Sequence, residues 1–179
     1  PVFFFLHNIV MTNFRQLEVI KMAYNREAAV AYALEWAYTY NPEFYNFNDI
    51  GGDCTNFASQ VLLAGGSMMN FNYPLGWYYV DVNNRSPSWT GVNELYEFLV
   101  NNQGIGPKAV LVDLSQIENG DIIQLDFRGD GIFDHTPVVV DKGEGTPETV
   151  LIAAHSCPAK NRPLSTYDYE GIRCLHIVS

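Results

Sequence analysis

The chain has 179 residues, of which 47% are hydrophobic and 17% charged, a composition that indicates one globular domain and excludes a disordered chain. Its formal net charge of −10 argues against nucleic acid and anionic membrane surfaces as partners, because phosphates attract Lys and Arg. No apolar run approaches the roughly 20 residues of a membrane span. Pro1 in place of Met indicates a processed piece, from which an export signal or a partner domain can be missing.

The N-terminal part of the chain predicts one helix after an arm without recognisable motifs. Residues 1–23 are this unassigned N-terminal arm, of which 12–22 could form a short helix. Over residues 26–40 apolar side chains recur at helical spacing, and Asn41-Pro42 ends the pattern. The shared face carries small and aromatic side chains that we expect in the core: Ala29, Tyr32, Ala33, Trp36 and Tyr40.

The chain is organised around a second predicted helix, which begins at Cys54 and ends at Ala64. Two glycines precede it (51–52) and two follow it (65–66). Asp53 is the candidate N-cap, and one of the following glycines supplies the left-handed residue at the helix end. One face of this helix is apolar, which places it against the core.

A long aromatic loop is expected over residues 67–90, and loops of this length are often functional. Trp77 and Trp89 are candidates for the walls of a substrate groove, with packing in the core as the alternative. A third helix is expected to begin with Thr90 as its N-cap and to end at Asn101, with apolar residues at helical spacing.

The second half of the chain changes from helical spacing to short apolar runs separated by glycine-containing turns. Helices followed by hairpin-linked strands predict an α+β fold, in which the helical half packs on an antiparallel sheet. Residues 24–179 then form a single domain. The predicted strands cover residues 109–112, 122–127, 136–140, 149–154 and 172–178.

Cys54 is the first candidate for chemistry, because it stands at a helix start. Backbone N–H groups and the helix dipole stabilise negative charge there, so the sequence predicts a lowered thiol pKa. The alternative for a lone cysteine is a buried and inert side chain.

Two histidines provide candidate bases for this thiol. His135 begins a predicted strand directly after Asp134, and His155 ends the next strand. Because a short connection makes these strands antiparallel neighbours, both imidazoles are expected at one edge of the sheet, facing Cys54. A nucleophile, a base and an orienting group form the constellation used in nucleophilic catalysis. Taken singly, each histidine could instead be structural.

Three cysteines cannot all pair within one chain. Cys157 and Cys174 could form a disulfide that leaves Cys54 free. This pairing would agree with a location outside the cytoplasm.

Two metal sites can be considered from the sequence. Residues 126–134 place oxygen ligands and a glycine as in a calcium loop, but Arg stands at its third position and Pro at its twelfth. A turn between two strands explains the same residues. Cys54, His135 and His155 could also be zinc ligands, although no second close ligand pair accompanies them. We therefore expect no metal and no cofactor.

The motifs around these candidates resemble the putative amidase domain of the NlpC/P60 and CHAP group. The resemblance covers about residues 24–177, and Gly51-Gly52-Asp53-Cys54-Thr55-Asn56-Phe57 is its most specific part. Further matching positions are Tyr24-Asn25-Arg26, Ala29, Tyr32-Ala33, Trp36, Asn41-Pro42, Ser59-Gln60, Gly65-Gly66, Trp89, Gly120-Asp121-Ile122-Ile123, Asp134-His135 and Ala154-His155.

The resemblance implies a papain-like fold and a cysteine peptidase or amidase, with peptide or peptidoglycan-like substrates and a secreted or cell-surface location. By position, Cys54 would be the nucleophile and His135 the general base and acid. The orienting group falls at or near His155, where relatives vary. Tyr45 is the candidate near the oxyanion site, and Asp53 is a supporting candidate.

The sequence thus predicts amide hydrolysis through a Cys54 acyl-enzyme with His135 as base. One alternative is a catalytically idle glycan- or peptide-binding module on the same scaffold. Another is an acyltransferase that uses the same Cys and His pair but transfers the acyl group to an amine. Oligomeric state and exact substrate are not determined at this level.

Overall fold

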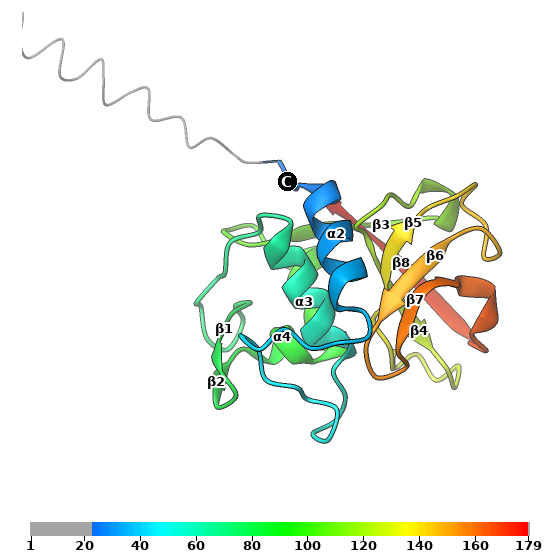
Figure 1. The fold of residues 1–179 in the computed structure, drawn as a ribbon. Coiled ribbons are helices and arrows are strands. Elements are labelled where there is room, and N and C mark those ends of the chain that lie inside the picture. The colour runs from blue at the N-terminus through cyan, green and yellow to red at the C-terminus, as the bar shows by residue number, and fades with distance from the viewer. Residues whose placement is uncertain (1–22, 179) are drawn as a thin grey trace, which may run out of the picture.

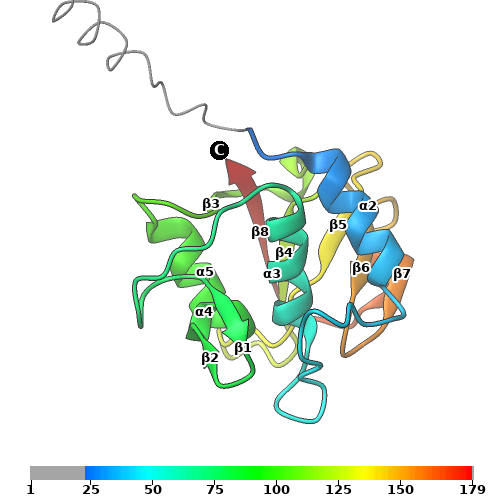
Figure 2. The ribbon, with the colours of Figure 1, turned by 60° about the vertical axis from the view of Figure 1, so that its left-hand side comes forward.

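The computed structural model describes residues 23–178 as helices packed against a six-stranded antiparallel sheet (Figures 1 and 2). This arrangement confirms the predicted α+β class. The helices are α2 (Arg26–Trp36), α3 (Cys54–Ala64), α4 (Pro87–Thr90) and α5 (Val92–Asn101), with 3-10 turns at Leu114–Gln116 and Leu164–Thr166. The strands are β1 (Tyr79–Asp81), β2 (Asn84–Arg85), β3 (Lys108–Val112), β4 (Ile122–Asp126), β5 (Val138–Asp141), β6 (Leu151–Ala154), β7 (Ala159–Pro163) and β8 (Gly171–Val178).

The strand order of the large sheet is β3-β8-β4-β5-β6-β7, while β1 and β2 form a separate hairpin. All five strands expected from the sequence are present. Strand β7 was not predicted, because Lys160, Asn161 and Arg162 make it a polar edge strand without apolar alternation. The expected loop over residues 67–90 is also wrong in its second half, which contains β1, β2 and α4. The predicted arm and the possible helix over 12–22 lie outside the described residues.

Helix α2 begins because Asn25 caps it, its side-chain oxygen accepting the backbone N–H of Ala28 at 3.0 Å. Its fully buried residues are small ones, Ala29 and Ala33, which let α3 and the sheet approach closely. The predicted core face is confirmed for Ala29 and Ala33, and Tyr32 and Trp36 pack against the same hydrophobic cluster, but Tyr40 does not belong to it. Tyr32 and Trp36 are only partly buried, and Tyr40 lies beyond the helix end with 38% of its surface exposed.

Helix α3 is the most enclosed helix of the described chain. Every residue from Cys54 to Leu62 is buried, between α2, α4 and the sheet (Figure 2). Gly66 has a φ of +93° and is the predicted left-handed residue after the helix end. The third helix starts later than expected: Thr90 ends the short α4, and Gly91 occupies the N-cap of α5.

The sheet carries a hydrophobic cluster on each side, because neighbouring residues of a strand face opposite ways. Ile122 and Val138 belong to the cluster under the helices, whereas Ile123 and Val139 belong to the cluster on the other face. None of the helices in residues 23–178 has the length and hydrophobicity to cross a bilayer.

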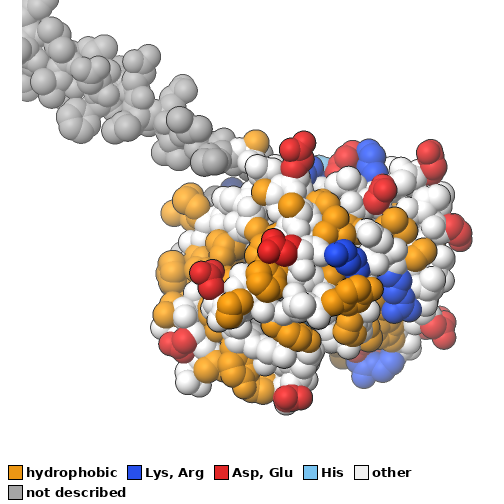
Figure 3. All heavy atoms as spheres, in the orientation of Figure 1, with side chains coloured by type: hydrophobic (Ala, Val, Ile, Leu, Met, Phe, Trp, Pro, Cys, Tyr) orange, Lys and Arg blue, Asp and Glu red, His pale blue; other side chains and the backbone are white. Residues whose placement is uncertain are grey.

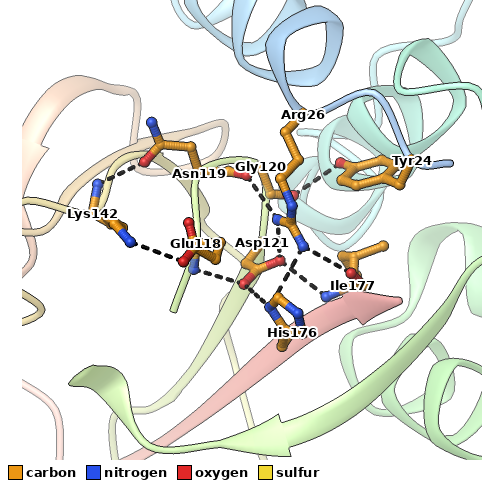
Figure 4. A network of polar contacts seen from close by, with 9 residues as sticks. All are labelled: Tyr24, Arg26, Glu118, Asn119, Gly120, Asp121, Lys142, His176 and Ile177. Atoms are coloured by element: carbon orange, nitrogen blue, oxygen red, sulfur yellow. Dashed lines mark hydrogen bonds and ion pairs between the residues drawn. The ribbon is translucent and has the colours of Figure 1, made fainter. Parts of the chain in front are cut away.

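A polar network fastens the start of α2 to strands β4 and β8 (Figure 4). Arg26 donates to a carboxylate oxygen of the fully buried Asp121 at 2.6 Å and to the carbonyl of Ile177 at 2.8 Å. The other carboxylate oxygen of Asp121 lies 2.8 Å from Nδ1 of His176. Tyr24 donates to the carbonyl of Gly120 at 2.9 Å. These contacts join segments 55 to 151 residues apart in the chain.

All three cysteines are free thiols, so the disulfide that Cys157 and Cys174 could have formed is not present. Cys174 is buried in β8, whereas Cys157 is exposed on the turn after β6. Without this disulfide, a location outside the cytoplasm rests on the family resemblance alone.

Candidate active site

Cys54 is the first residue of α3, as predicted, and only 7% of its surface is exposed. Its sulfur lies 3.8 Å from the hydroxyl oxygen of Thr55 and takes a hydrogen bond from the backbone N–H of Thr136. Burial is the largest influence on this thiol and raises its pKa, against the effect of these hydrogen bonds. The predicted lowering of the pKa is therefore wrong, because the loss of hydration outweighs the helix N-terminus.

His135 lies three residues before β5 and forms a backbone bridge with Leu125 of β4. Its ring packs against Phe127 at a centroid distance of 5.9 Å and against Tyr167 at 5.6 Å. Only 2% of the residue is exposed, and burial lowers the pKa of the imidazole to about 4. The ring is therefore neutral at pH 7.

Nε2 of His135 is buried and has no hydrogen-bond partner among the described residues. Such an atom is rare, because burying a polar group without a partner costs about 1–3 kcal/mol. A neutral imidazole with an unpartnered nitrogen retains the capacity to accept or donate a proton.

The residue after His135 joins it to the cysteine helix. Thr136 offers its backbone N–H to Cys54, and its hydroxyl lies 3.0 Å from the hydroxyl of Thr55. The peptide bond between His135 and Thr136 thus lies against the thiol. Tyr167 packs against the ring of His135, and burial raises the pKa of its hydroxyl group. The contact between Thr55 and Thr136 therefore brings the residue after His135 to the start of α3.

His155 follows β6 and makes different contacts from those expected. Its Nδ1 lies 2.5 Å from a carboxylate oxygen of Asp53, and its Nε2 donates to the carbonyl of Trp36 at 2.8 Å. Its ring stacks on Phe57 at a centroid distance of 4.1 Å. With both nitrogens occupied in this way, His155 does not orient His135, which corrects its predicted place in a catalytic triad.

Asp53 occupies the N-cap position of α3, but its side chain makes no capping bond to the helix backbone. Its second carboxylate oxygen instead accepts the backbone N–H of Phe47 at 2.8 Å and the side-chain amide of Asn56 at 2.9 Å. Its own backbone N–H donates to the hydroxyl of Ser156 at 2.6 Å. His155 thus contacts the side chain of Asp53, and Ser156 accepts its backbone N–H.

The two tryptophans proposed as groove walls, Trp77 and Trp89, are fully buried. Their rings pack at a centroid distance of 4.8 Å, and each indole N–H bonds to a side chain of α3. The alternative interpretation as core residues is therefore correct. Tyr45 stands on the loop before α3 with 44% of its surface exposed, and its carbonyl accepts a hydrogen bond from Asn56.

The possible calcium loop is the turn between β4 and His135. Asp126 accepts the backbone N–H groups of Arg128, Gly129 and Gly131 at 2.8–2.9 Å, so its carboxylate shapes the turn. Arg128 pairs with Asp134 at 2.9 Å. Within residues 23–178, no three His, Cys, Asp or Glu side chains are grouped as ligands for a metal ion.

Three residues of this site were not found from the sequence. Thr136 and Ser156 directly follow the two histidines. A hydroxyl residue after each histidine was the signal in the sequence, and both hydroxyl groups form hydrogen bonds at the start of α3. Tyr167 carried no signal, because it lies in no motif and about 30 residues from His135. The guanidinium group of Arg162 stacks over the ring of Tyr167, with its carbon 3.8 Å from the ring centroid.

The contrast between the thiols gives a direct test of the raised Cys54 pKa. At pH 7, we expect iodoacetamide to alkylate Cys54 at least about tenfold more slowly than the exposed Cys157, since the thiolate is the reacting form. Peptide mass spectrometry measures each rate, and labelling in denaturant provides the control in which the difference disappears. Rapid labelling of Cys54 near pH 6 would instead show an activated thiolate.

The fold and the site define an α+β protein with a buried thiol at the start of a helix and a buried imidazole next to a threonine that contacts this helix. Residues 23–178 match the family described as "Putative amidase domain", and the chain belongs to this family. Membership points to amide hydrolysis as the general class of reaction.

Two relatives from Bacillus subtilis (strain 168) are similar to this chain. "Uncharacterized protein YhbB" is 40% identical over 125 residues, which cover 68% of this chain and 39% of that protein. "Uncharacterized protein YjcM" is 26% identical over 166 residues, which cover 87% of this chain and 37% of that protein. The chain therefore spans less than half the length of these relatives. No solved structure matches it.

Proposed function

We propose that this protein hydrolyses amides through a thioester formed on Cys54, with His135 as general base and acid. The observation that carries the proposal is the buried neutral imidazole with an unpartnered Nε2, adjoining a residue that contacts the thiol. Family membership supports the class of reaction.

The reaction would start from a neutral pair, because burial raises the pKa of Cys54 and lowers that of His135. The thiol transfers its proton to His135 while its sulfur attacks the amide carbonyl carbon. The developing oxyanion balances the imidazolium charge in the buried site and accepts hydrogen bonds from backbone N–H groups at the start of α3.

The second half of the reaction regenerates the free site. The imidazolium gives its proton to the leaving amine, the C–N bond breaks, and a thioester remains on Cys54. Water then adds to the thioester while His135 accepts its proton, and the acid leaves as the thiol is restored. His155 does not touch the reacting atoms in this scheme. It positions Cys54 through its contact with Asp53.

The finer parts of the proposal follow from the resemblance described above. They are a papain-like arrangement, peptide or cell-wall amides as substrates, and a location outside the cytoplasm. The fold is compatible with a papain-like arrangement. A helix that begins with a cysteine packs on an antiparallel sheet, and His135 lies just before a strand of that sheet.

Replacing Cys54 by Ala tests the proposal. In a screen of peptide amides and peptidoglycan fragments, we expect the variant to lose at least about a thousandfold of the hydrolysis rate, because the nucleophile is removed. Cys157→Ala is the matched control, since this exposed thiol lies outside the proposed mechanism. Mass spectrometry of the products distinguishes hydrolysis, which yields an acid, from acyl transfer, which yields a new amide.

Burial of Cys54 is the observation that favours the idle binding module, because a thiol that is 7% exposed meets substrate poorly without movement. Ligand binding without turnover in both the wild type and Cys54→Ala would support that function. Turnover that survives in Cys54→Ala would contradict the thioester mechanism.

A further inference from the structure

A groove of about 1070 Å³ runs between α5 and the loop that connects α3 to β1. Figure 2 shows this loop and α5 side by side, with α5 next to β3 at the edge of the large sheet. One wall carries Phe71, Tyr73 and Leu75, and the other carries Glu94 and Glu97. Small-molecule sites usually measure 300–1,000 Å³, so this groove is large enough for a ligand of several residues.

The loop wall is apolar and exposed. Tyr73 is 73% exposed, Leu75 83% and Phe71 63%, although all three lie within five residues. The ring of Phe71 stacks on Tyr78 at a centroid distance of 5.0 Å, which holds it in place. Figure 3 shows hydrophobic side chains gathered on the side of the molecule where this loop runs. An exposed patch of this kind marks a surface for binding.

The helix wall is acidic. Glu94 and Glu97 stand one turn apart on α5, and the residues lining the groove include no Lys or Arg. Within residues 23–178, neither carboxylate has an ion-pair partner, and Glu97 only accepts a hydrogen bond from Asn101 at 3.0 Å. A cationic group is complementary to this wall, and an anionic one is repelled.

One end of the groove adjoins the chain that leads to the candidate active site. Asn93 lines the groove and donates to the carbonyl of Phe133 at 3.1 Å, while its side-chain oxygen accepts the N–H of Phe133 at 3.3 Å. Phe133 precedes His135 by two residues. An extended ligand covers about 3.3 Å per residue, so a segment leaving the groove at Asn93 can continue toward His135.

We propose that this groove binds an extended peptide segment that carries an apolar side chain and a positively charged one, and presents a neighbouring amide to Cys54. The apolar side chain packs on Tyr73 and Leu75, and the cation pairs with Glu94 and Glu97. The peptide-binding part stands on the groove alone, whereas presentation of the amide rests on the proposed function. Neutral sugar rings would match the aromatic wall but leave both carboxylates without a counter-charge.

The test measures binding separately from turnover. The 179-residue chain with Cys54→Ala is titrated with three fluorescent hexapeptides that are identical except for Lys, Gln or Glu beside a Leu. We expect the Lys peptide to bind best and the Glu peptide worst, with a difference of about tenfold that salt reduces. Substituting both Glu94→Gln and Glu97→Gln should remove this order, and Tyr73→Ala should weaken all three peptides alike.

Glu144→Gln is the matched control, because this exposed carboxylate lies in the turn between β5 and β6, outside the groove. Thermal unfolding of each variant establishes that binding is compared between folded proteins. Equal binding of the three peptides, an order that survives the double substitution, or absence of peptide binding would overturn the proposal. Binding of a neutral chito-oligosaccharide in place of the peptides would assign the groove to glycans.

A separate incubation of the wild type with the Lys peptide follows its cleavage. If the expected binding order appears but no peptide is cleaved, the groove is correct and the catalytic proposal fails for these substrates. If peptides are cleaved at equal rates without the binding order, the catalytic proposal holds and the groove inference is wrong.

Discussion

Replacing Asp121 by Ala is expected to lower the free energy of unfolding by about 3–5 kcal/mol, the range for breaking one side of a buried charge network. Asp121 is fully buried and receives Arg26 at 2.6 Å. It also accepts the backbone N–H groups of Glu118 and Ile177 at 2.8 and 2.9 Å and contacts His176 at 2.8 Å (Figure 4). Ala would leave these groups without their shared acceptor.

The neighbouring exposed ion pair provides the control for Asp121. Glu118 and Lys142 are 2.8 Å apart with about half of each side chain exposed. Glu118→Ala should therefore cost less than about 1 kcal/mol, because water screens and replaces such a pair. Urea unfolding of both variants measures the difference. A loss in Asp121→Ala no larger than in Glu118→Ala would show that this network does not hold α2 to the sheet.

His135 is expected to make the fold about 3 kcal/mol less stable at pH 4 than at pH 7. Burial lowers the pKa of its imidazole from 6.5 to about 4, so between these values the unfolded chain binds a proton that the folded chain does not. The stabilising contribution is fully present above pH 6.5. It is lost progressively as the pH falls through 6.5 and reaches its minimum below pH 4.

His135→Gln isolates this contribution, because Gln does not titrate in this range. Urea unfolding of both proteins at pH 4, 5, 6 and 7 gives two stability curves, and the carboxylates that also titrate contribute equally to both. We expect the wild type to lose about 3 kcal/mol more than the variant on going from pH 7 to pH 4. Parallel curves would mean that the imidazole is hydrated in the folded protein.

Cys54 shows why the candidate active site was only partly predictable from the sequence. Periodicity and glycine positions were sufficient to predict the helix at Cys54 and its left-handed residue Gly66, because these depend on a few neighbouring residues. The pKa of Cys54 depends mainly on how much water reaches the thiol, and the packing of the rest of the fold around the start of α3 decides that. The position of Cys54 at a helix start therefore predicted a pKa shift of the wrong sign.

The tertiary structure also decided in which direction each of the two histidine side chains points. Thr136 and His155 both reach the start of α3, whereas His135, next to Thr136, packs against Phe127 and Tyr167. Because side chains alternate along extended chain, a difference of one residue changes the partners. Spacing in the sequence placed both histidines at strand ends but did not determine the partners of either ring.

By itself, the sequence determined the α+β order, the bounds of the cysteine helix to within a residue and the five apolar strands, since each arises from local patterns of hydrophobicity and turn residues. Only the tertiary structure decided that Trp77 and Trp89 belong to the core, that Asp53 engages His155, and that the groove lies along α5. Burial and ion pairing join residues far apart in the chain, and local backbone preferences carry no information about such distant partners.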